Sequence, residues 1–203
     1  MHSLRRLLIV GFFTIVFISS VREYVPVLYA ASLTMVRDLI STSAPSTAAT
    51  HTIQFTLSHG VPVSGKIVIT PEAGMFGIPA GFSFTDVDVL VSTGGPYNDR
   101  ALAAAPAATS DGISIVTGSS GSITITLNST VALDEGSSVR VLLGTHATVG
   151  GMGSISLINP SSPGSYRVRV ATFDASSVAI DASQTLIAVV APVTNSLANE
   201  NVP

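Results

Sequence analysis

The regular segments of this sequence alternate apolar and polar residues with a period of two. In the segment 52–57, Ile53, Phe55 and Leu57 occupy one phase, while threonine and glutamine occupy the other. Successive side chains of a β-strand point to opposite faces of a sheet, so the pattern predicts strands with one buried and one solvated face. The same alternation occurs at 66–70, 84–91, 122–128, 139–143, 165–172 and 184–190, and more weakly at 33–40, 113–117 and 154–158.

Clusters of turn-forming residues separate these segments. Ser and Thr together number 48 of 203 residues, and 17 Gly and 11 Pro interrupt the chain, which is typical of short strands joined by turns. Alternation, in place of continuous apolar runs, favours antiparallel pairing. We therefore predict an all-β fold, an antiparallel β-sandwich of about ten short strands. The predicted core consists of Ile53, Phe55, Ile67, Ile69, Val87, Val89, Ile123, Ile125, Leu127, Val141, Val168 and Val170.

The N-terminus has the pattern of a targeting segment. Arg5 and Arg6 precede an uncharged apolar run at 7–21, and small residues follow near Ala30. A basic head, an apolar middle and a small-residue exit predict a secretory signal peptide. The run is shorter than the roughly 20 residues that span a bilayer. Because Arg22 and Leu28 depart from the signal pattern, a retained membrane anchor is the alternative for this hydrophobic leader helix.

Three parts of the chain are therefore expected. Residues 1–30 form the signal peptide or membrane anchor, and 31–191 form the β-sandwich domain. Residues 192–203 turn polar and form a linker stub or a truncated C-terminus. Within the sandwich, the alanine-rich stretch 100–108 suggests a helical turn that Pro106 limits.

Charge and cysteine content exclude several classes of function. The formal net charge is −3, and without the leader the chain carries six basic and eleven acidic residues, a net −5. Lys66 is the only lysine, so a basic footprint for nucleic acid or anionic lipid is missing from the sequence. The lack of cysteine excludes disulfides, thiolate zinc sites and cysteine nucleophiles. We predict no nucleic-acid partner, and membrane contact only through an uncleaved N-terminal segment.

Asp86 and Asp88 form the one pair of acids on a predicted strand. Two residues apart, their carboxylates would share a face at about 7 Å, which makes them weak calcium candidates. The chain has no calcium-loop spacing, and further ligands would have to come from predicted turns, at Asp99, Asp111, Asp134 or Glu135. The favoured interpretation places both acids on the solvated face, where charge opposes edge-to-edge aggregation.

Two motifs around Lys66 resemble functional sites. Residues 60–66 match the first seven positions of a phosphate-binding loop, but Ile67 occupies the position of the required Ser or Thr and a strand follows, so a hairpin turn is the better interpretation. A Lys to Asn amide crosslink would need Lys66 in a dry core. Lys66 is in phase with Val68 and opposite Ile67, which predicts that it points outward.

The sequence positions of the histidine and aromatic residues predict no catalytic, metal or sugar-binding site. His51, His59 and His146 are scattered, and no serine-hydrolase elbow accompanies them. The aromatic candidates for stacking on sugar rings are interpreted mainly as core residues, and they are Tyr97, Tyr166, Phe76, Phe82 and Phe173. We therefore predict no catalytic residue, no cofactor and no essential metal.

Three segments resemble a known family. They are the strand and turn 65–74, the strand 84–89, and the segment 159–170, which reads NPSSPGSYRVRV. These segments resemble immunoglobulin-like β-sandwich modules of secreted bacterial surface proteins, as in predicted large surface proteins of candidate-phylum bacteria. The resemblance covers about 31–191. It implies an immunoglobulin-like fold and a surface location, with no catalytic residues to transfer.

The function expected from these observations is that of a non-enzymatic secreted or cell-surface module, structural or adhesive in role. The expected partners are other surface proteins or extracellular glycans. A carbohydrate-binding β-sandwich is the alternative. An exposed row of aromatic residues on one sheet would favour the alternative, and a smooth face of Ser and Thr would favour the first function.

Overall fold

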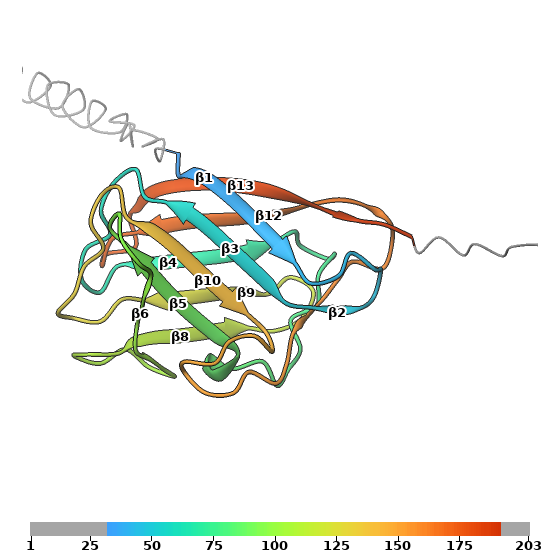
Figure 1. Ribbon diagram of the computed structural model, residues 1–203, viewed down its shortest axis with the longest axis horizontal. Helices are drawn as coiled ribbons and strands as arrows, with labels where there is room; N and C mark the ends of the chain where they lie inside the picture. Colours follow the sequence, from blue (N-terminus) through green and yellow to red (C-terminus); the bar gives the residue numbers. More distant parts are fainter. Residues whose placement is uncertain (1–31, 192–203) are drawn as a thin grey trace, which may run out of the picture.

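The predicted alternation appears as two β-sheets that face each other across a common core (Figure 1). The computed structural model describes residues 32–191, so the predictions for residues 1–30 and 192–203 lie outside the described residues. The five-stranded sheet has the order β1-β3-β10-β5-β6. Its strands are β1 (Thr34–Ile40), β3 (His51–Thr56), β10 (Ser138–Leu143), β5 (Val87–Ser92) and β6 (Asn98–Asp99).

The six-stranded sheet has the order β13-β12-β4-β9-β8-β7. A separate two-stranded sheet pairs β11 (Leu157–Ile158) with β2 (Ala48–Ala49). The strands of the six-stranded sheet are β13 (Ala179–Val189), β12 (Gly164–Phe173), β4 (Lys66–Pro71), β9 (Ser122–Thr126), β8 (Asp111–Val116) and β7 (Leu102–Ala103).

The core lies between the inner faces of these two sheets. In β3 the burial pattern alternates strictly, with His51, Ile53 and Phe55 buried. All twelve residues predicted for the core are confirmed there, each at most 1% exposed. The all-β class and the sandwich architecture predicted from the alternation are therefore confirmed.

Several details of the prediction are corrected. The described residues form thirteen strands, several of them only two residues long, in place of about ten. The predicted strand 154–158 shortens to β11, and the stretch 100–108 contains β7 in place of a helical turn. The pairing of β7 with β8 is parallel, unlike the other ladders. The length of a strand and the direction of its pairing depend on strands that are distant in sequence, and alternation within one segment does not predict them.

The predicted strand 84–91 begins three residues late. Residues 84–86 form a short 3-10 helix, η1 (Phe84–Asp86), because Ser83 caps it. The Ser83 hydroxyl accepts from the N–H of Thr85, and the Asp86 carboxylate accepts from the N–H of Ser83 at 2.9 Å. This reciprocal capping draws Asp86 back toward Ser83 and delays β5 until Val87.

The edge strands β1 and β13, one from each sheet, run beside each other along the molecule (Figure 1). Beyond β13, the N–H of Val190 donates to the carbonyl of Ser43 at 2.9 Å. Within residues 32–191, no helix has the length and apolar character needed to cross a membrane.

Candidate functional site

Asp86 and Asp88 are both buried, which corrects the expectation that they lie on a solvated face. Each is 1% exposed. Asp88 does point to the outer face of the five-stranded sheet, opposite in phase to Val87 and Val89, but the glycine-rich segment 144–156 covers it. We call this segment the glycine loop.

The two carboxylates bind different parts of the glycine loop. Asp88 accepts from three consecutive backbone N–H groups, those of Thr148 at 2.6 Å, Val149 at 3.0 Å and Gly150 at 3.2 Å. Asp86 accepts from the N–H groups of Ser154 at 2.7 Å and Ile155 at 2.9 Å. The N–H groups of Ser154 and Ile155 therefore donate to a carboxylate, and β11 begins only at Leu157.

The environment of Asp86 favours its charged form. Burial acts to raise the pKa of Asp86, but the N–H donors of Ser154, Ile155 and Ser83 outweigh burial and hold the pKa below its ordinary value of 3.8. Within residues 32–191, no group of three or more acidic or histidine side chains is arranged to hold a metal ion. The weak calcium prediction at Asp86 and Asp88 stays a prediction, with oxygens that already accept from separate backbone segments.

Two histidines pair with aspartates that the sequence did not single out. His51 Nδ1 lies 2.7 Å from Asp38 Oδ2, and both side chains are buried. The exposed His59 lies 2.9 Å from the fully buried Asp181, whose other oxygen accepts from the backbone N–H of His59. The hydrogen bond and the charge of Asp181 raise the pKa of His59 above its ordinary 6.5.

His146 lies on the outer side of the five-stranded sheet. Its Nε2 is 3.3 Å from the hydroxyl of Thr52. Burial lowers the pKa of His146 below 6.5, against the opposing charge of Asp88. The side chains of the three histidines thus have separate polar partners. His146 also lies close to the backbone of His51, whereas His59 pairs with Asp181.

A sequence signal could have identified the buried aspartates. Asp38 shares its strand phase with Val36 and Ile40, and Asp111 shares its phase with Ile113. Asp181 likewise shares the inward phase of Ile187. A carboxylate in the apolar phase of a strand needs a buried partner, so each of these positions predicts an ion pair or a capped carboxylate.

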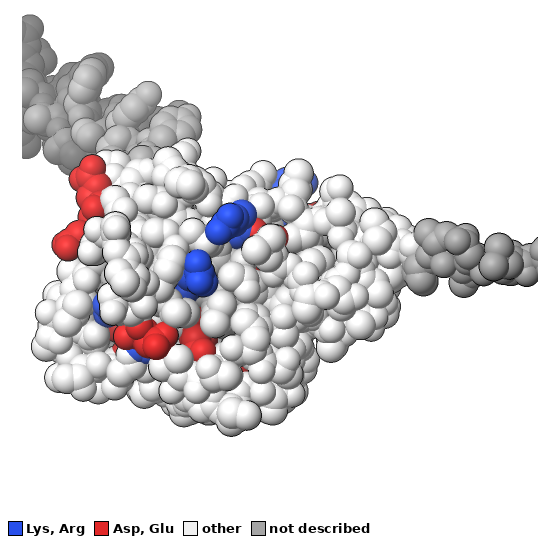
Figure 2. All heavy atoms as spheres, viewed as in Figure 1, with Lys and Arg blue, Asp and Glu red and all other residues white. Residues whose placement is uncertain are grey.

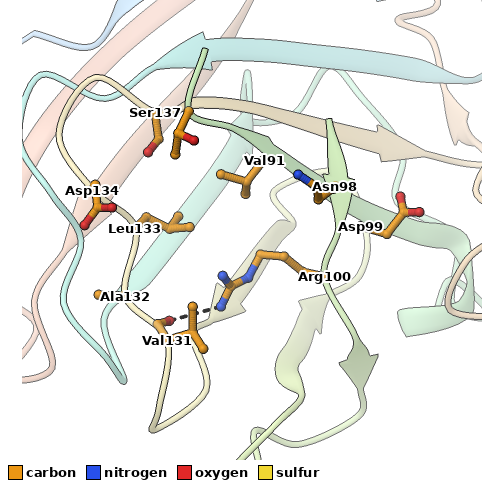
Figure 3. Close-up of a pocket in the computed structure, with 10 residues that line it drawn as sticks. Val91, Asn98, Asp99, Arg100, Val131, Ala132, Leu133, Asp134 and Ser137 are labelled. Carbon is orange, nitrogen blue, oxygen red and sulfur yellow. Dashed lines mark hydrogen bonds between the residues drawn. The ribbon is translucent and has the colours of Figure 1, made fainter. Parts of the chain in front are cut away.

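Arg100 lines a small hollow beside β6 (Figure 3), and Arg100 is held by the buried Asp111. The carboxylate of Asp111 forms a two-bond ion pair with Arg100, and it also accepts from the backbone and side-chain N–H groups of Asn128 at 2.8 and 2.9 Å. Figure 3 shows Arg100 reaching into the hollow, where its Nη2 donates to the carbonyl of Val131 at 3.1 Å.

The hollow is small and mixed in character. It has a volume of about 290 Å³ and is lined by Val91, Thr93, Asn98, Asp99, Arg100, Val131, Ala132, Leu133, Asp134 and Ser137. The hydroxyl of Ser137 is buried without a hydrogen-bond partner in the described chain. Because Asp111 already neutralises Arg100, the exposed Asp99 and Asp134 set the charge of the rim.

The outer face of the five-stranded sheet carries few charges (Figure 2). Arg37, Gln54 and Arg140 lie in register across β1, β3 and β10, and Arg37 donates to Gln54 Oε1 at 2.7 Å. The guanidinium carbon of Arg140 lies 4.0 Å from the ring centre of Tyr97, whose hydroxyl is 2.7 Å from Ser138 Oγ. Arg140 therefore covers one face of the Tyr97 ring, which could otherwise stack on a ligand.

Of the other aromatic candidates, Phe76, Phe82 and Tyr166 are buried or packed against neighbouring groups. Phe76 and Phe82 are buried, which confirms their prediction as core residues. The half-buried Tyr166 packs edge-on against Phe76 at 6.1 Å between ring centres, and its hydroxyl donates to the carbonyl of Ser162. Among residues 32–191, no aromatic side chain is exposed, and Phe173 is half-buried.

The outer face of the six-stranded sheet holds a shallow groove of about 420 Å³. The groove contains one ammonium, surrounded by hydroxyl and apolar side chains. Its lining residues are Lys66, Val68, Ser114, Thr124, Thr126, Phe173 and Ser177. Lys66 points outward as predicted, and its Nζ donates to Ser177 Oγ at 2.8 Å. The segment before it is a turn, closed by the N–H of Gly65 donating to the carbonyl of Pro62 at 2.9 Å. The hairpin interpretation of that motif is consistent with this turn.

No family model matches the sequence, and no curated protein matches it. Among the solved structures that it resembles is a collagen-binding domain from a Staphylococcus aureus adhesin, at 7% identity and TM-score 0.40, over 75% of this chain and 96% of that chain. A group B streptococcus pilus 2b backbone protein is similar at 12% identity and TM-score 0.43, over 75% and 56%. A family IIIa CBD from Clostridium cellulolyticum is similar at 15% identity and TM-score 0.31, over 80% and 100%.

Two of the similar structures carry the names of enzymes, AvmM and a manganese lipoxygenase.

Proposed function

We propose that this chain is a non-enzymatic structural or adhesive module that works by presenting its sheet faces outside the cytoplasm. The observation that carries the proposal is the character of the two outer faces. The face of the five-stranded sheet seen in Figure 2 is sparsely charged, and four hydroxyl side chains line the groove of the six-stranded sheet. Apart from the half-buried Phe173, the aromatic rings of residues 32–191 are buried or packed against neighbouring groups. The buried carboxylates already accept hydrogen bonds from backbone and side-chain groups of this chain. They are Asp86, Asp88, Asp111 and Asp181.

The location outside the cytoplasm rests on the N-terminal leader. A basic head and an apolar run at 7–21 support export, with cleavage near Ala30 or retention as an anchor. The domain bounds 31–191, the immunoglobulin-like assignment of the sandwich and the polar end 192–203 belong to the same proposal.

The experiment measures retention and turnover together. Beads that carry the full chain are passed over purified extracellular proteins and polysaccharides, each immobilised separately. We expect specific retention on at least one polymer and no change in its mass or chain length. Beads that carry heat-unfolded chain control for nonspecific contact. Retention equal to that control on every polymer would contradict the adhesive role, and a released product would contradict the non-enzymatic role.

Carbohydrate binding is the second candidate, and the groove around Lys66 favours it. Four hydroxyl side chains and the ring of Phe173 line one concave surface of a rigid sheet. Ligand pockets in proteins combine apolar walls with a few placed polar groups in this way. The groove offers one aromatic wall, so it suits a single sugar residue better than a flat polysaccharide surface.

A further inference from the structure

The groove on the six-stranded sheet follows directly from strand register. Phe173, Lys66 and Thr126 lie opposite one another on β12, β4 and β9, and they form one row across the outer face. The next row contains Val68, Thr124 and Ser114. Because the rows belong to paired strands, the backbone holds these side chains at fixed spacing before any ligand arrives.

The β12–β13 turn closes one end of the groove and is itself held firmly. The N–H of Asp174 donates to the carbonyl of Val178 at 2.9 Å, and the N–H of Val178 donates to Asp174 Oδ1 at 2.8 Å. Ser177 in this turn has φ of 67°, a conformation that non-glycine residues rarely adopt. The closed turn holds the Ser177 hydroxyl against the Lys66 ammonium, which leaves the groove pre-organised.

Lys66 brings a positive charge with no acidic partner in the described chain. An ammonium has three N–H donors, and one of them is used by Ser177. Within residues 32–191, no carboxylate lies within ion-pair distance of Lys66, and none lines the groove. The groove therefore presents unused cationic donors on a protein whose remaining net charge is negative.

Charge complementarity favours a ligand with a single anionic group, such as a carboxylate. One ammonium suits one anionic group at a time, whereas the net −5 of the chain without its leader repels densely charged polyanions. The carboxylate would replace water at the Nζ donors in a charge-assisted hydrogen bond.

The rest of the groove matches a sugar ring. Ser114, Thr124 and Thr126 offer hydroxyls along the floor, and Phe173 and Val68 offer apolar surface for the C–H face of a ring. A volume of about 420 Å³ lies within the range of small-ligand sites and exceeds what a single carboxylate side chain would fill. We infer that this groove binds a carboxylated sugar residue of an extracellular glycan. The inference rests on the carbohydrate-binding candidate above.

The test uses titration calorimetry on the full chain at one fixed salt concentration. The probes are a trisaccharide that carries one galacturonic acid residue, the same trisaccharide with that carboxylate methyl-esterified, and a tripeptide that carries one glutamate. We expect the acidic sugar to bind, and the ester and the peptide to bind at least about tenfold more weakly. Lys66→Gln should weaken binding of the acidic sugar about tenfold or more, and Phe173→Ala should weaken it as well.

The matched control is Arg169→Gln. Arg169 is exposed on the same sheet face and carries the same charge, but it lies outside the groove. Its removal should change the affinity less than twofold. Thermal unfolding of each variant verifies that the fold is intact, and Ser177→Ala provides a second variant that keeps the charge and should weaken binding.

Several outcomes would overturn the assignment. Equal binding of the methyl ester would show that no carboxylate is recognised, and equal binding of the peptide would assign the groove to an acidic protein segment. An equal loss of affinity in Lys66→Gln and Arg169→Gln would show that binding depends on the overall positive charge of this sheet face and not on the groove. Lack of binding by the acidic sugar, with retention on another polymer in the bead experiment, would contradict this inference and leave the adhesive role standing.

Discussion

Asp86 and Asp88, two residues apart in the chain, hold opposite ends of one glycine-rich loop. Asp88 binds the N–H groups of 148–150, and Asp86 binds those of 154 and 155. Between these anchors the loop carries Met152, which is 83% exposed. The loop is therefore fixed at both ends by buried charge while its tip stays open to solvent.

Replacing one anchor should loosen the loop. Asp88→Asn removes the charge that three N–H groups share, and we expect a loss of about 2–3 kcal/mol in the free energy of unfolding. Hydrogen exchange should accelerate at Thr148, Val149 and Gly150 and stay slow in β3. The exposed Asp99→Asn is the control, with a change within about 0.5 kcal/mol. Unchanged exchange at the three amides would contradict the anchoring role.

The assigned strand faces predict opposite effects at neighbouring positions of β3. Phe55 is fully buried, so Phe55→Ala should lower the free energy of unfolding by on the order of 3 kcal/mol. The side chain of Thr56 points outward, so Thr56→Ala should be close to neutral. Denaturant titration measures both variants. Equal losses at the two positions would contradict the assignment.

The pH dependence of stability should separate His59 from His146. The pKa of His59 is raised in the folded chain, so its contribution is complete below about pH 6.5 and is lost as the pH rises through the folded pKa. The pKa of His146 is lowered, so its penalty appears as the pH falls below 6.5. His59→Gln should flatten the loss above pH 6.5 only, and His146→Gln should flatten the loss below it. Thermal unfolding across pH 5 to 8.5 tests both, and a slope that neither variant changes would argue against these assignments.

Export should leave a defined N-terminus. If residues 1–30 are a signal peptide, mass spectrometry of exported protein should find a chain that begins near Ala31 or Ser32. Recovery of intact Met1 from purified membranes would establish the alternative, a retained anchor.

The midpoint of thermal unfolding should not depend on calcium. An ion that binds only to the native state raises the free energy of unfolding by mass action. Because the oxygens of Asp86 and Asp88 already accept backbone N–H groups, we expect the same midpoint in chelator and in excess calcium. A rise of several degrees in calcium would restore the calcium hypothesis, and Asp86 and Asp88 would then be the first residues to mutate.

Alternation predicted the core well because it is a local property. The period of two predicts burial from the residues of one strand alone, without knowledge of its neighbours. Ile53 and Phe55 in β3, and Ile67 and Ile69 in β4, are examples. The same rule failed at Asp86 and Asp88, because the loop that buries them lies about 60 residues later in the chain. Strand phase states which face a side chain points to, and it does not state what covers that face.

The candidate sites were harder to predict for a related reason. The outward direction of Lys66 followed from its phase, but its neighbours Phe173 and Ser177 come from strands and turns that only the register brings beside it. The pairs His51 with Asp38 and His59 with Asp181 likewise join distant segments. The aspartates of these pairs lie in the apolar phase of their strands, so the sequence contained a local signal that they are buried. It contained no signal that identified the histidines as their partners.

The adjacency of β1 and β13 has a mechanical consequence. The described chain enters at the start of β1 and leaves after the end of β13, at opposite ends of the long axis (Figure 1). Tension between these ends would act along both strands, perpendicular to the hydrogen bonds that join β1 to β3 and β13 to β12. Such a load shears many hydrogen bonds at once and does not unzip them singly, so the fold is oriented to resist a pull along its length.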